Sequence, residues 1–417
     1  MTDAVVVGGG LAGLVAARHL AESGRDVTLL EAREEVGGRV RTAHEDGYTF
    51  DRGFQVLFTA YPAVRRELDI EALSPRAFTP GATIARPNHR SVLSDPLRKP
   101  TAAPETLLNR DVRTTDKLRL FRLQRELAKR DPEVILEGGG QSIESYLADR
   151  GFSKRFVERF AAPFYGGITL DRSLGTDSAV FEYTYKMLSE GEIFVPARGM
   201  QAMPAQLAER ATDAGATIET DTEVTDIDAG ENEVTVETDG ETHSADGTVV
   251  ATDPGTAATL TEVDTIPTET LGCVTQYFAL PTSKAPKMGK RIVLNAADER
   301  PNTVAPLSTV APEYAPEGME LYSATFLGSP DRDDSALEAD VRRALSSWYP
   351  SAGFDALEHL RTDHVEVAQF AQPPGYRADL PDPDAPSGPV VLAGDYTRWS
   401  SIQGALESGR VAAGLLA

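Results

Sequence analysis

A glycine-rich turn near the N-terminus provides the clearest chemical signal in the sequence. Gly8, Gly10 and Gly13 form a G-x-G-x-x-G pattern directly after a short apolar run. The first glycine permits a tight turn, the second lets the backbone approach a pyrophosphate, and the third lets a helix pack closely against a strand. Leu11 and Ala12 would begin that helix, whose free N–H groups and positive dipole end attract phosphate. The pattern therefore predicts a dinucleotide-binding turn.

An acidic residue follows the turn where ribose recognition requires one. Glu31 ends a second apolar run, at 27–30, and its carboxylate is placed to accept hydrogen bonds from a ribose. The same negative charge would repel a 2′-phosphate, which disfavours NADP. NAD and the adenosine half of FAD remain as candidates at this point.

The residues after Glu31 distinguish between these two candidates. Glu31, Ala32 and Arg33 are followed closely by Gly38 and Arg39. A glycine pair lets the chain pass close to an extended dinucleotide, and arginines balance a diphosphate. The segment resembles the flavin-binding signature of the superfamily of FAD-dependent amine oxidases, phytoene desaturases and protoporphyrinogen oxidases. This resemblance implies FAD as the cofactor.

Two internal stretches extend the resemblance. Gly53, Phe54 and Gln55 lie in a segment similar to the one that runs past the isoalloxazine ring in the desaturase-like branch. Residues 196–204 resemble the glycine–methionine turn of the family. In relatives, the backbone at the position of Val224 meets the adenine, and the resemblance implies the same contact here.

The C-terminal segment resembles the closing flavin motif of the superfamily. Gly394 and Asp395 follow an apolar run, and Ile402, Gln403 and Ala405 follow shortly afterwards. The resemblance implies that Asp395 lies against the ribityl-phosphate portion and that a helix from about Gln403 directs its N-terminus at flavin O2. Reduced flavin carries negative charge near N1 and O2, which such a helix end would stabilise.

The candidates on the substrate side carry weaker signals. Tyr165 lies in a stretch, 163–168, that matches one walling the substrate cavity in the desaturase-like branch. Arg52 precedes the isoalloxazine segment, and Arg398 and Trp399 follow Asp395. Packing in a core explains the aromatic candidates equally well.

Two features of true amine oxidases are not recognisable in the sequence. One is the lysine that contacts flavin N5 through a water, and the other is the pair of aromatic side chains that cage an amine. We therefore expect an apolar polyene or tetrapyrrole-like substrate. An amine oxidase proper and a flavin-dependent isomerase or cyclase remain alternatives. The electron acceptor is left open between oxygen, a quinone or another molecule.

The composition excludes other classes of partner. The net charge is −23, with 41 Lys and Arg against 64 Asp and Glu, which argues against nucleic acid and against anionic lipid. This acidity fits an organism with high internal salt, although an ordinary acidic cytosolic protein is the alternative. Cys273 is the single cysteine and the six histidines lack ligand spacing, so we expect no metal.

The elements that must position these residues follow from the patterning. Apolar runs separated by an Ala-rich helix predict a strand–helix–strand opening, and we expect an α/β fold with a Rossmann-type FAD domain and an inserted mixed α+β substrate domain. A helix at 117–129 is expected to place Leu118, Phe121 and Leu127 on one side. No apolar run is long enough to span a membrane and no signal peptide is evident, so we expect a cytoplasmic protein. Nothing in the sequence supports contact with a membrane.

The expected domains are discontinuous. The FAD domain takes residues 1–85, 195–265 and 385–417, and the substrate domain takes 86–194 and 266–384.

Overall fold

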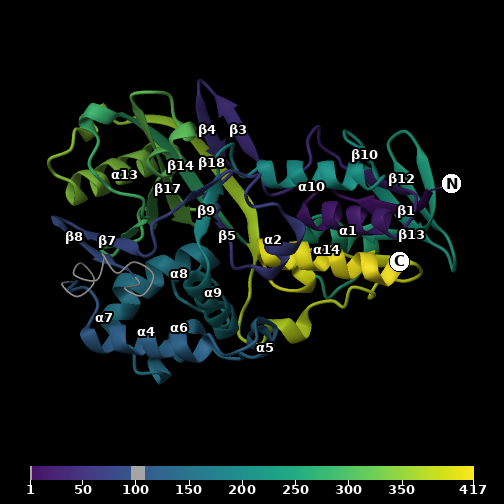
Figure 1. Ribbon diagram of the computed structural model, residues 1–417, viewed down its shortest axis with the longest axis horizontal. Coiled ribbons are helices and arrows are strands. Elements are labelled where there is room, and N and C mark those ends of the chain that lie inside the picture. Colours follow the sequence, from purple (N-terminus) through teal and green to yellow (C-terminus); the bar gives the residue numbers. More distant parts are fainter. Residues whose placement is uncertain (1, 95–108) are drawn as a thin grey trace.

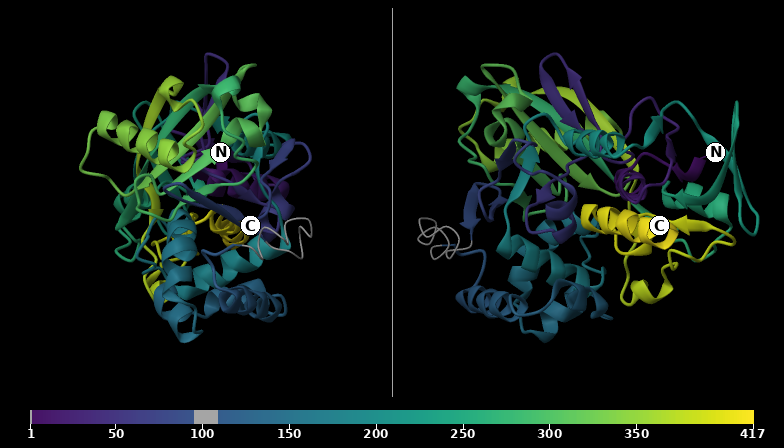
Figure 2. Two further views of the ribbon diagram at one scale, coloured as in Figure 1. Left: turned by 90° about the vertical axis from the view of Figure 1, so that its left-hand side faces the viewer. Right: turned by 45° about the vertical axis from the view of Figure 1, so that its right-hand side comes forward.

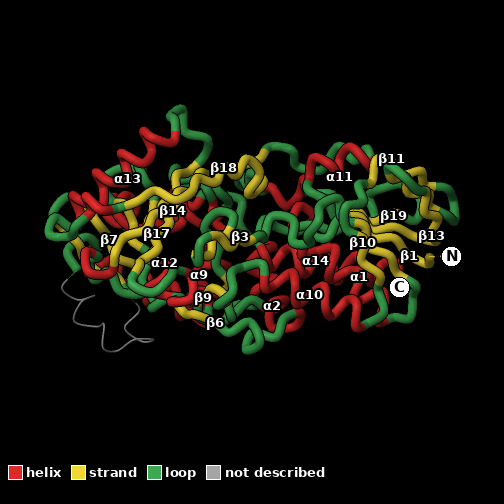
Figure 3. The backbone as a smooth tube through the Cα atoms, turned by 90° about the horizontal axis from the view of Figure 1, so that it is seen from above, coloured by secondary structure: helices red, strands yellow, loops and turns green. Residues whose placement is uncertain are grey.

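Two seven-stranded sheets organise the computed structural model, which describes residues 2–94 and 109–417 (Figure 1). Residues 95–108, which the sequence assigned to the substrate domain, lie outside the described residues. The two sheets occupy opposite ends of the long axis (Figure 3). This arrangement confirms the expected α/β fold with a second, mixed domain.

The first sheet has the strand order of a nucleotide-binding domain. Its central strands run β10-β2-β1-β13, all parallel, and β12 and β11 continue the sheet as an antiparallel extension. The turn at Asp239 and Gly240 joins β12 to β13 in an antiparallel hairpin. The strands are β1 (Thr2–Val7), β2 (Val27–Leu30), β10 (Thr217–Glu219), β11 (Val224–Ala229), β12 (Val234–Thr238), β13 (Thr242–Val250) and β19 (Val390–Leu392).

Three parallel strands end together at one edge of this sheet. β13 pairs with β1 on one side and with β19 on the other, so Val7, Val250 and Leu392 stand in register. The ladder continues past the strand ends, where Ala393 N–H donates to the Val250 carbonyl at 2.8 Å. The chain segments after Val7 and after Leu392 therefore leave the sheet as close neighbours.

Helices α1 and α14 pack side by side against the sheet (Figure 3). A side chain at Gly409 of α14 would press directly against the Ala12 carbonyl oxygen of α1, so the two backbones are in close contact. α1 buries an apolar face that includes Leu14 and Leu20. The helices of this domain are α1 (Leu11–Glu22), α2 (Pro62–Glu67), α10 (Ala202–Asp213), α11 (Pro254–Thr261) and α14 (Ile402–Leu416).

The second sheet is mostly antiparallel and carries α13 (Asp334–Trp348) on one face. Leu337 and Trp348 of that helix pack in a core with Phe278 and Tyr322 of the sheet. β7 pairs with β15, so the second sheet already begins before the expected boundary at residue 85. In spatial order, the strands are β18 (Glu358–Phe370), β14 (Thr270–Pro281), β17 (Met319–Leu327), β16 (Thr303–Pro306), β15 (Val293–Asn295), β7 (Ala82–Arg86) and β8 (His89–Leu93).

Short elements connect the two large sheets. β3 and β4 form a two-stranded hairpin, in which β4 runs from Tyr48 to Asp51. β9 lies between β5 and β6 and pairs with both. These elements are β3 (Thr42–Glu45), β4 (Tyr48–Asp51), β5 (Leu57–Phe58), β6 (Pro75–Ala77), β9 (Ile193–Pro196) and α12 (Leu307–Val310).

The remaining helices form a layer beneath the second sheet (Figure 2). α7 continues into α8 through a π-helical turn at Val157–Ala161, so residues 154–169 form one long helix. The helices are α4 (Thr114–Leu127), α5 (Pro132–Glu137), α6 (Ile143–Asp149), α7 (Lys154–Phe156), α8 (Ala162–Thr169) and α9 (Ser178–Glu190). Within residues 2–94 and 109–417, no helix combines the length and apolarity needed to cross a bilayer.

The side of α4 predicted to carry Leu118, Phe121 and Leu127 is buried only at Leu127. Leu118 and Phe121 are 50% and 36% exposed, whereas Leu123 and Leu127 are buried. The cause is Asp116, whose carboxylate is buried because it accepts hydrogen bonds from the backbone and hydroxyl of Ser153. Fixing Asp116 inward turns Leu118 outward.

The contact between α1 and α14 makes a prediction. Replacing Gly409 with alanine should destabilise the fold by about 1–3 kcal/mol, because the added methyl group forces two backbones apart. Gly414→Ala in the same helix is the matched control, since a Cβ there meets nothing within 4 Å. The control should be neutral or stabilising by about 0.5–1 kcal/mol. Thermal unfolding of both variants checks this, and equal melting temperatures would contradict the packing described.

Candidate functional site

The glycine turn, residues 8–13, is tightly packed at Gly8 and Gly13 but open at Gly10, and we refer to it as the cradle. A Cβ at Gly13 would collide with the Gly8 carbonyl oxygen, and one at Gly8 would lie 2.9 Å from the Ala251 oxygen, whereas one at Gly10 would meet nothing within 4 Å. Gly10 is also the N-cap of α1 and offers no side-chain cap. The first N–H groups of α1, at Leu11 and beyond, therefore keep the donor capacity that a phosphate requires.

Glu31 fastens this cradle to the end of β2. Its Oε2 accepts the Gly9 N–H at 2.7 Å and its Oε1 accepts the Arg33 N–H at 3.0 Å, while the residue is only 7% exposed. The Glu31 carbonyl accepts the Thr222 N–H at 2.9 Å, which brings the strand that begins at Val224 alongside. Each carboxylate oxygen keeps a lone pair for a further donor such as a ribose hydroxyl.

Arg39 joins the N-terminal and C-terminal segments. Its Nη2 lies 2.6 Å from Oδ1 of Asp395, and Ser400 Oγ donates to the other oxygen of that carboxylate at 3.0 Å. A Cβ at Gly38 would lie 3.3 Å from the Gly10 Cα, so Arg39 follows directly on the cradle. Burial alone would lower the pKa of Arg39, but the charge of Asp395 and its hydrogen bond outweigh burial and raise that pKa.

Further arginines lie near these residues. Arg33, Arg41 and Arg52 lie close enough to influence one another, and burial together with the charges of Arg52 and Arg33 lowers the pKa of Arg41. The Nε of Arg41 is buried without a hydrogen-bond partner among the described residues. The free Nε of Arg41 leaves a donor that an anionic ligand could accept.

The segment around Gly53 is held by a buried carboxylate. Asp51 accepts hydrogen bonds from Thr42 Oγ1 at 2.6 Å, from Met200 N–H at 2.7 Å and from Tyr314 OH at 2.9 Å. Burial raises the pKa of Asp51, although these three donors oppose the shift. Tyr277 also donates its hydroxyl to the Asp51 carbonyl. The sequence did not single out the two tyrosines, because nothing nearby in the chain marks partners so distant.

The rest of this segment lies beside Arg39. Gln55 Nε2 donates to the Arg39 carbonyl at 3.1 Å, and Phe54 packs edge-on against Phe78 at 6.1 Å between ring centroids. Gly53 has φ +76°, a conformation that side chains rarely adopt. Gln55 thus ties this segment to Arg39.

The start of α14 differs slightly from expectation. The helix begins at Ile402, and Ser401 caps it by accepting the Gly404 N–H at 2.8 Å. Gln403 is buried and its Oε1 accepts the Ala63 N–H, so this side chain fastens α2 to α14. Ile402 and Ala405 are only partly buried.

The aromatic catalytic candidates lie in cores. Tyr165 is 2% exposed and packs against Phe181 at 4.6 Å between ring centroids, and burial raises its pKa well above the usual value. Trp399 is 4% exposed and contacts Tyr183 at 5.0 Å. Arg52 and Arg398 are half-buried, and Arg398 does not share the hydrogen bonds around Asp395 except through its backbone N–H.

A partly buried pair of aromatic rings, which we refer to as the aromatic face, lies on the helix whose C-terminal end approaches Arg39. Phe160, Phe164 and Ile168 lie one helical turn apart on the long helix, and the rings of Phe160 and Phe164 stack at 5.2 Å with an interplanar angle of 12°. Gln369 donates to the Ile168 carbonyl at 2.6 Å, and the neighbouring Ala368 carbonyl accepts from Arg39. The helix therefore ends close to Asp395, with apolar rings not fully covered by protein.

No cluster of three or more His, Cys, Asp or Glu suited to a metal ion occurs in the described part of the chain. The cradle, the unpaired arginine nitrogens and the accepting carboxylate of Glu31 fit the diphosphate and ribose groups of FAD. The site so defined is that of a dinucleotide-binding flavoprotein.

Comparisons with known proteins agree with this class. The family model for flavin containing amine oxidoreductase matches residues 11–417. The chain therefore belongs to that family of FAD-dependent oxidoreductases, and FAD is its cofactor.

Curated relatives cover only part of the chain. Phytoene dehydrogenase of Streptomyces griseus is 30% identical over 277 residues, which are 60% of this chain and 54% of that protein. Protoporphyrinogen oxidase 2 of Arabidopsis thaliana is 29% identical over 162 residues, or 39% of this chain and 31% of that protein. A carotenoid 3,4-desaturase of Haloarcula japonica is 53% identical over 51 residues, 12% of this chain and 10% of that protein. The chain thus spans about half or less of these relatives' length.

Solved structures share the fold over the whole chain. An oxidoreductase from Methanosarcina mazei superimposes with a TM-score of 0.74 at 19% identity, covering 98% of this chain and 99% of that one. A putrescine oxidase bound to putrescine gives a TM-score of 0.72 at 17% identity, covering 99% and 98%.

Glu31 provides the prediction for this site. Glu31→Gln should weaken FAD binding about tenfold or more, because an amide supplies one acceptor oxygen where the carboxylate supplies two charged ones. Glu31→Lys should purify without FAD. Glu34→Gln, at an exposed position three residues away, should leave the affinity unchanged. The ratio of flavin to protein absorbance and the FAD Kd measure this. A yellow, fully occupied Glu31→Lys variant would show that Glu31 does not contact the cofactor.

Proposed function

We propose that the protein oxidises a C–C bond, or less favourably a C–N bond, of an apolar substrate such as a polyene or tetrapyrrole. FAD, when bound, supplies the chemistry by accepting a hydride at N5. The observation that carries the substrate class is the stacked, partly buried pair of Phe160 and Phe164 on the helix whose C-terminal end approaches Arg39.

The roles proposed for the chain's residues follow from their surroundings. The N-terminus of α1 and the arginines at 33 and 41 hold the diphosphate, and Glu31 holds the ribose, with the backbone near Val224 against adenine. Asp395 faces the ribityl portion, where Arg39 and Ser400 fix its two oxygens. Gly53, Phe54 and Gln55 pass the ring system, and Asp51 orients them from behind.

The aromatic face would orient the substrate. Parallel rings offer a flat apolar surface that suits a conjugated chain or a flat macrocycle, and burying such a substrate excludes water from the reacting bond. A small amine would instead leave these rings exposed. The names of the relatives, phytoene dehydrogenase and carotenoid 3,4-desaturase, support a polyene.

Anaerobic mixing tests the proposal. The oxidised flavin absorbance of the purified protein should bleach when phytoene or protoporphyrinogen is added, and should persist with putrescine. Bleaching by putrescine alone would contradict the proposal in favour of an amine oxidase. Turnover that needs pre-reduced flavin and leaves it reduced would contradict it in favour of an isomerase or cyclase.

The aromatic face can be tested in the same experiment. Phe164→Ala should raise the substrate concentration for half-maximal bleaching at least about tenfold, because it removes roughly 1.5 kcal/mol or more of apolar contact. The matched control is Phe121→Ala, since Phe121 is an exposed ring on α4, away from this face. Equal behaviour of the two variants would remove the aromatic face from the substrate site.

A further inference from the structure

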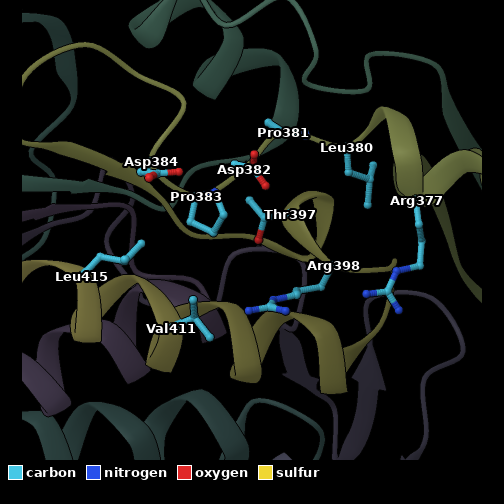
Figure 4. A pocket seen from close by; sticks show the side chains of 10 residues that line it. All are labelled: Arg377, Leu380, Pro381, Asp382, Pro383, Asp384, Thr397, Arg398, Val411 and Leu415. Atoms are coloured by element: carbon cyan, nitrogen blue, oxygen red, sulfur yellow. The ribbon is translucent and has the colours of Figure 1, made fainter. Parts of the chain in front are cut away.

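A cavity lies outside the residues assigned to FAD. It has a volume of about 340 Å³ and lies between α14 and the proline-rich segment 380–384. This volume falls at the lower end of the range for small-molecule pockets, roughly 300–1,000 Å³. Figure 4 shows the Arg398 side chain lying over α14 and extending away from Arg377 toward Val411, with Leu415 farther along the same helix.

Two arginines of this lining keep unused donors. Neither guanidinium forms a hydrogen bond or an ion pair within residues 2–94 and 109–417, and Nη1 of Arg377 and Nε of Arg398 are buried. Glu133 lies close enough for both positive charges to lower its pKa against the effect of burial, but it forms no ion pair with either arginine. Comparable half-buried arginines, such as Arg66 and Arg130, pair with carboxylates. A buried, unpaired guanidinium nitrogen costs free energy unless an anion fills the position.

The other residues that line the cavity restrict which anions could bind there. Asp382 and Asp384 border the cavity, so a second negative charge on the ligand would be repelled. The planar guanidinium fork matches a carboxylate bidentately. The other lining side chains are mainly apolar and suit a hydrocarbon body: Leu380, Pro381, Pro383, Val411 and Leu415.

We propose that this cavity binds a small monocarboxylate with an apolar body, its carboxylate held by Arg377 and Arg398. The site is separate from the proposed flavin site, although both use the turn that follows β19: the Arg398 N–H donates to the Asp395 carbonyl at 3.0 Å. Its existence does not depend on the reaction proposed above.

Calorimetric titration of the FAD-loaded protein with sodium hexanoate tests the site. One equivalent should bind, and Arg377→Gln and Arg398→Gln should each weaken binding about tenfold or more, the usual effect of losing a charge-assisted hydrogen bond. Arg155→Gln, at an exposed position on α7, is the control and should bind as the unmodified protein does. Arg398→Lys should restore part of the affinity, and melting temperatures show that each variant is folded.

Three further probes separate the alternatives. Acetate and hexylamine should bind at least about tenfold more weakly than hexanoate, because one lacks the apolar body and the other the negative charge. Sulfate binding as tightly as hexanoate would overturn the proposal in favour of a general anion site. No binding of hexanoate, or equal binding to all arginine variants, would overturn it altogether.

Discussion

The pairing of β13 with both β1 and β19 is the constraint on which the structure depends. It sets Val7, Val250 and Leu392 in register, so that the glycine turn and Asp395 leave the sheet at the same edge. No contact within either segment would bring them together, since they lie at opposite ends of the chain. The close approach of α14 to α1 at Gly409 reinforces the same geometry from the helical side.

Several hydrogen-bond donors near this edge of the first sheet have no partner in the part of the chain that the structure describes. Arg39 is paired with Asp395, whereas the neighbouring Arg41 keeps a buried Nε without a hydrogen-bond partner among the described residues. The first turn of α1 likewise contains no acidic residue and no side-chain cap, whereas α11 and α14 are capped by Asp253 and Ser401. Unused donors around one cradle are costly in an empty fold and become favourable around a bound diphosphate.

The sequence predicted the local parts of this arrangement and missed the distant ones. The glycine spacing, Glu31 and the elements around them follow short-range rules, so they were readable from adjacent residues. Tyr277 and Tyr314 were not, because they meet Asp51 only after the second sheet folds over it. Trp399 was a catalytic candidate from its nearness to Asp395 in the chain, but the turn between them directs its ring into a core beside Tyr183.

The central claim is that segments from both ends of the chain bind one FAD, and the FAD dissociation constant of Asp395→Ala tests it most directly. Asp395 lies far in sequence from the glycine turn, yet its loss should weaken FAD binding about tenfold or more, since a charged, doubly hydrogen-bonded carboxylate is removed. The exposed Asp384→Ala is the control and should bind FAD as the unmodified protein does. An unchanged dissociation constant for Asp395→Ala in a protein of normal melting temperature would contradict the account.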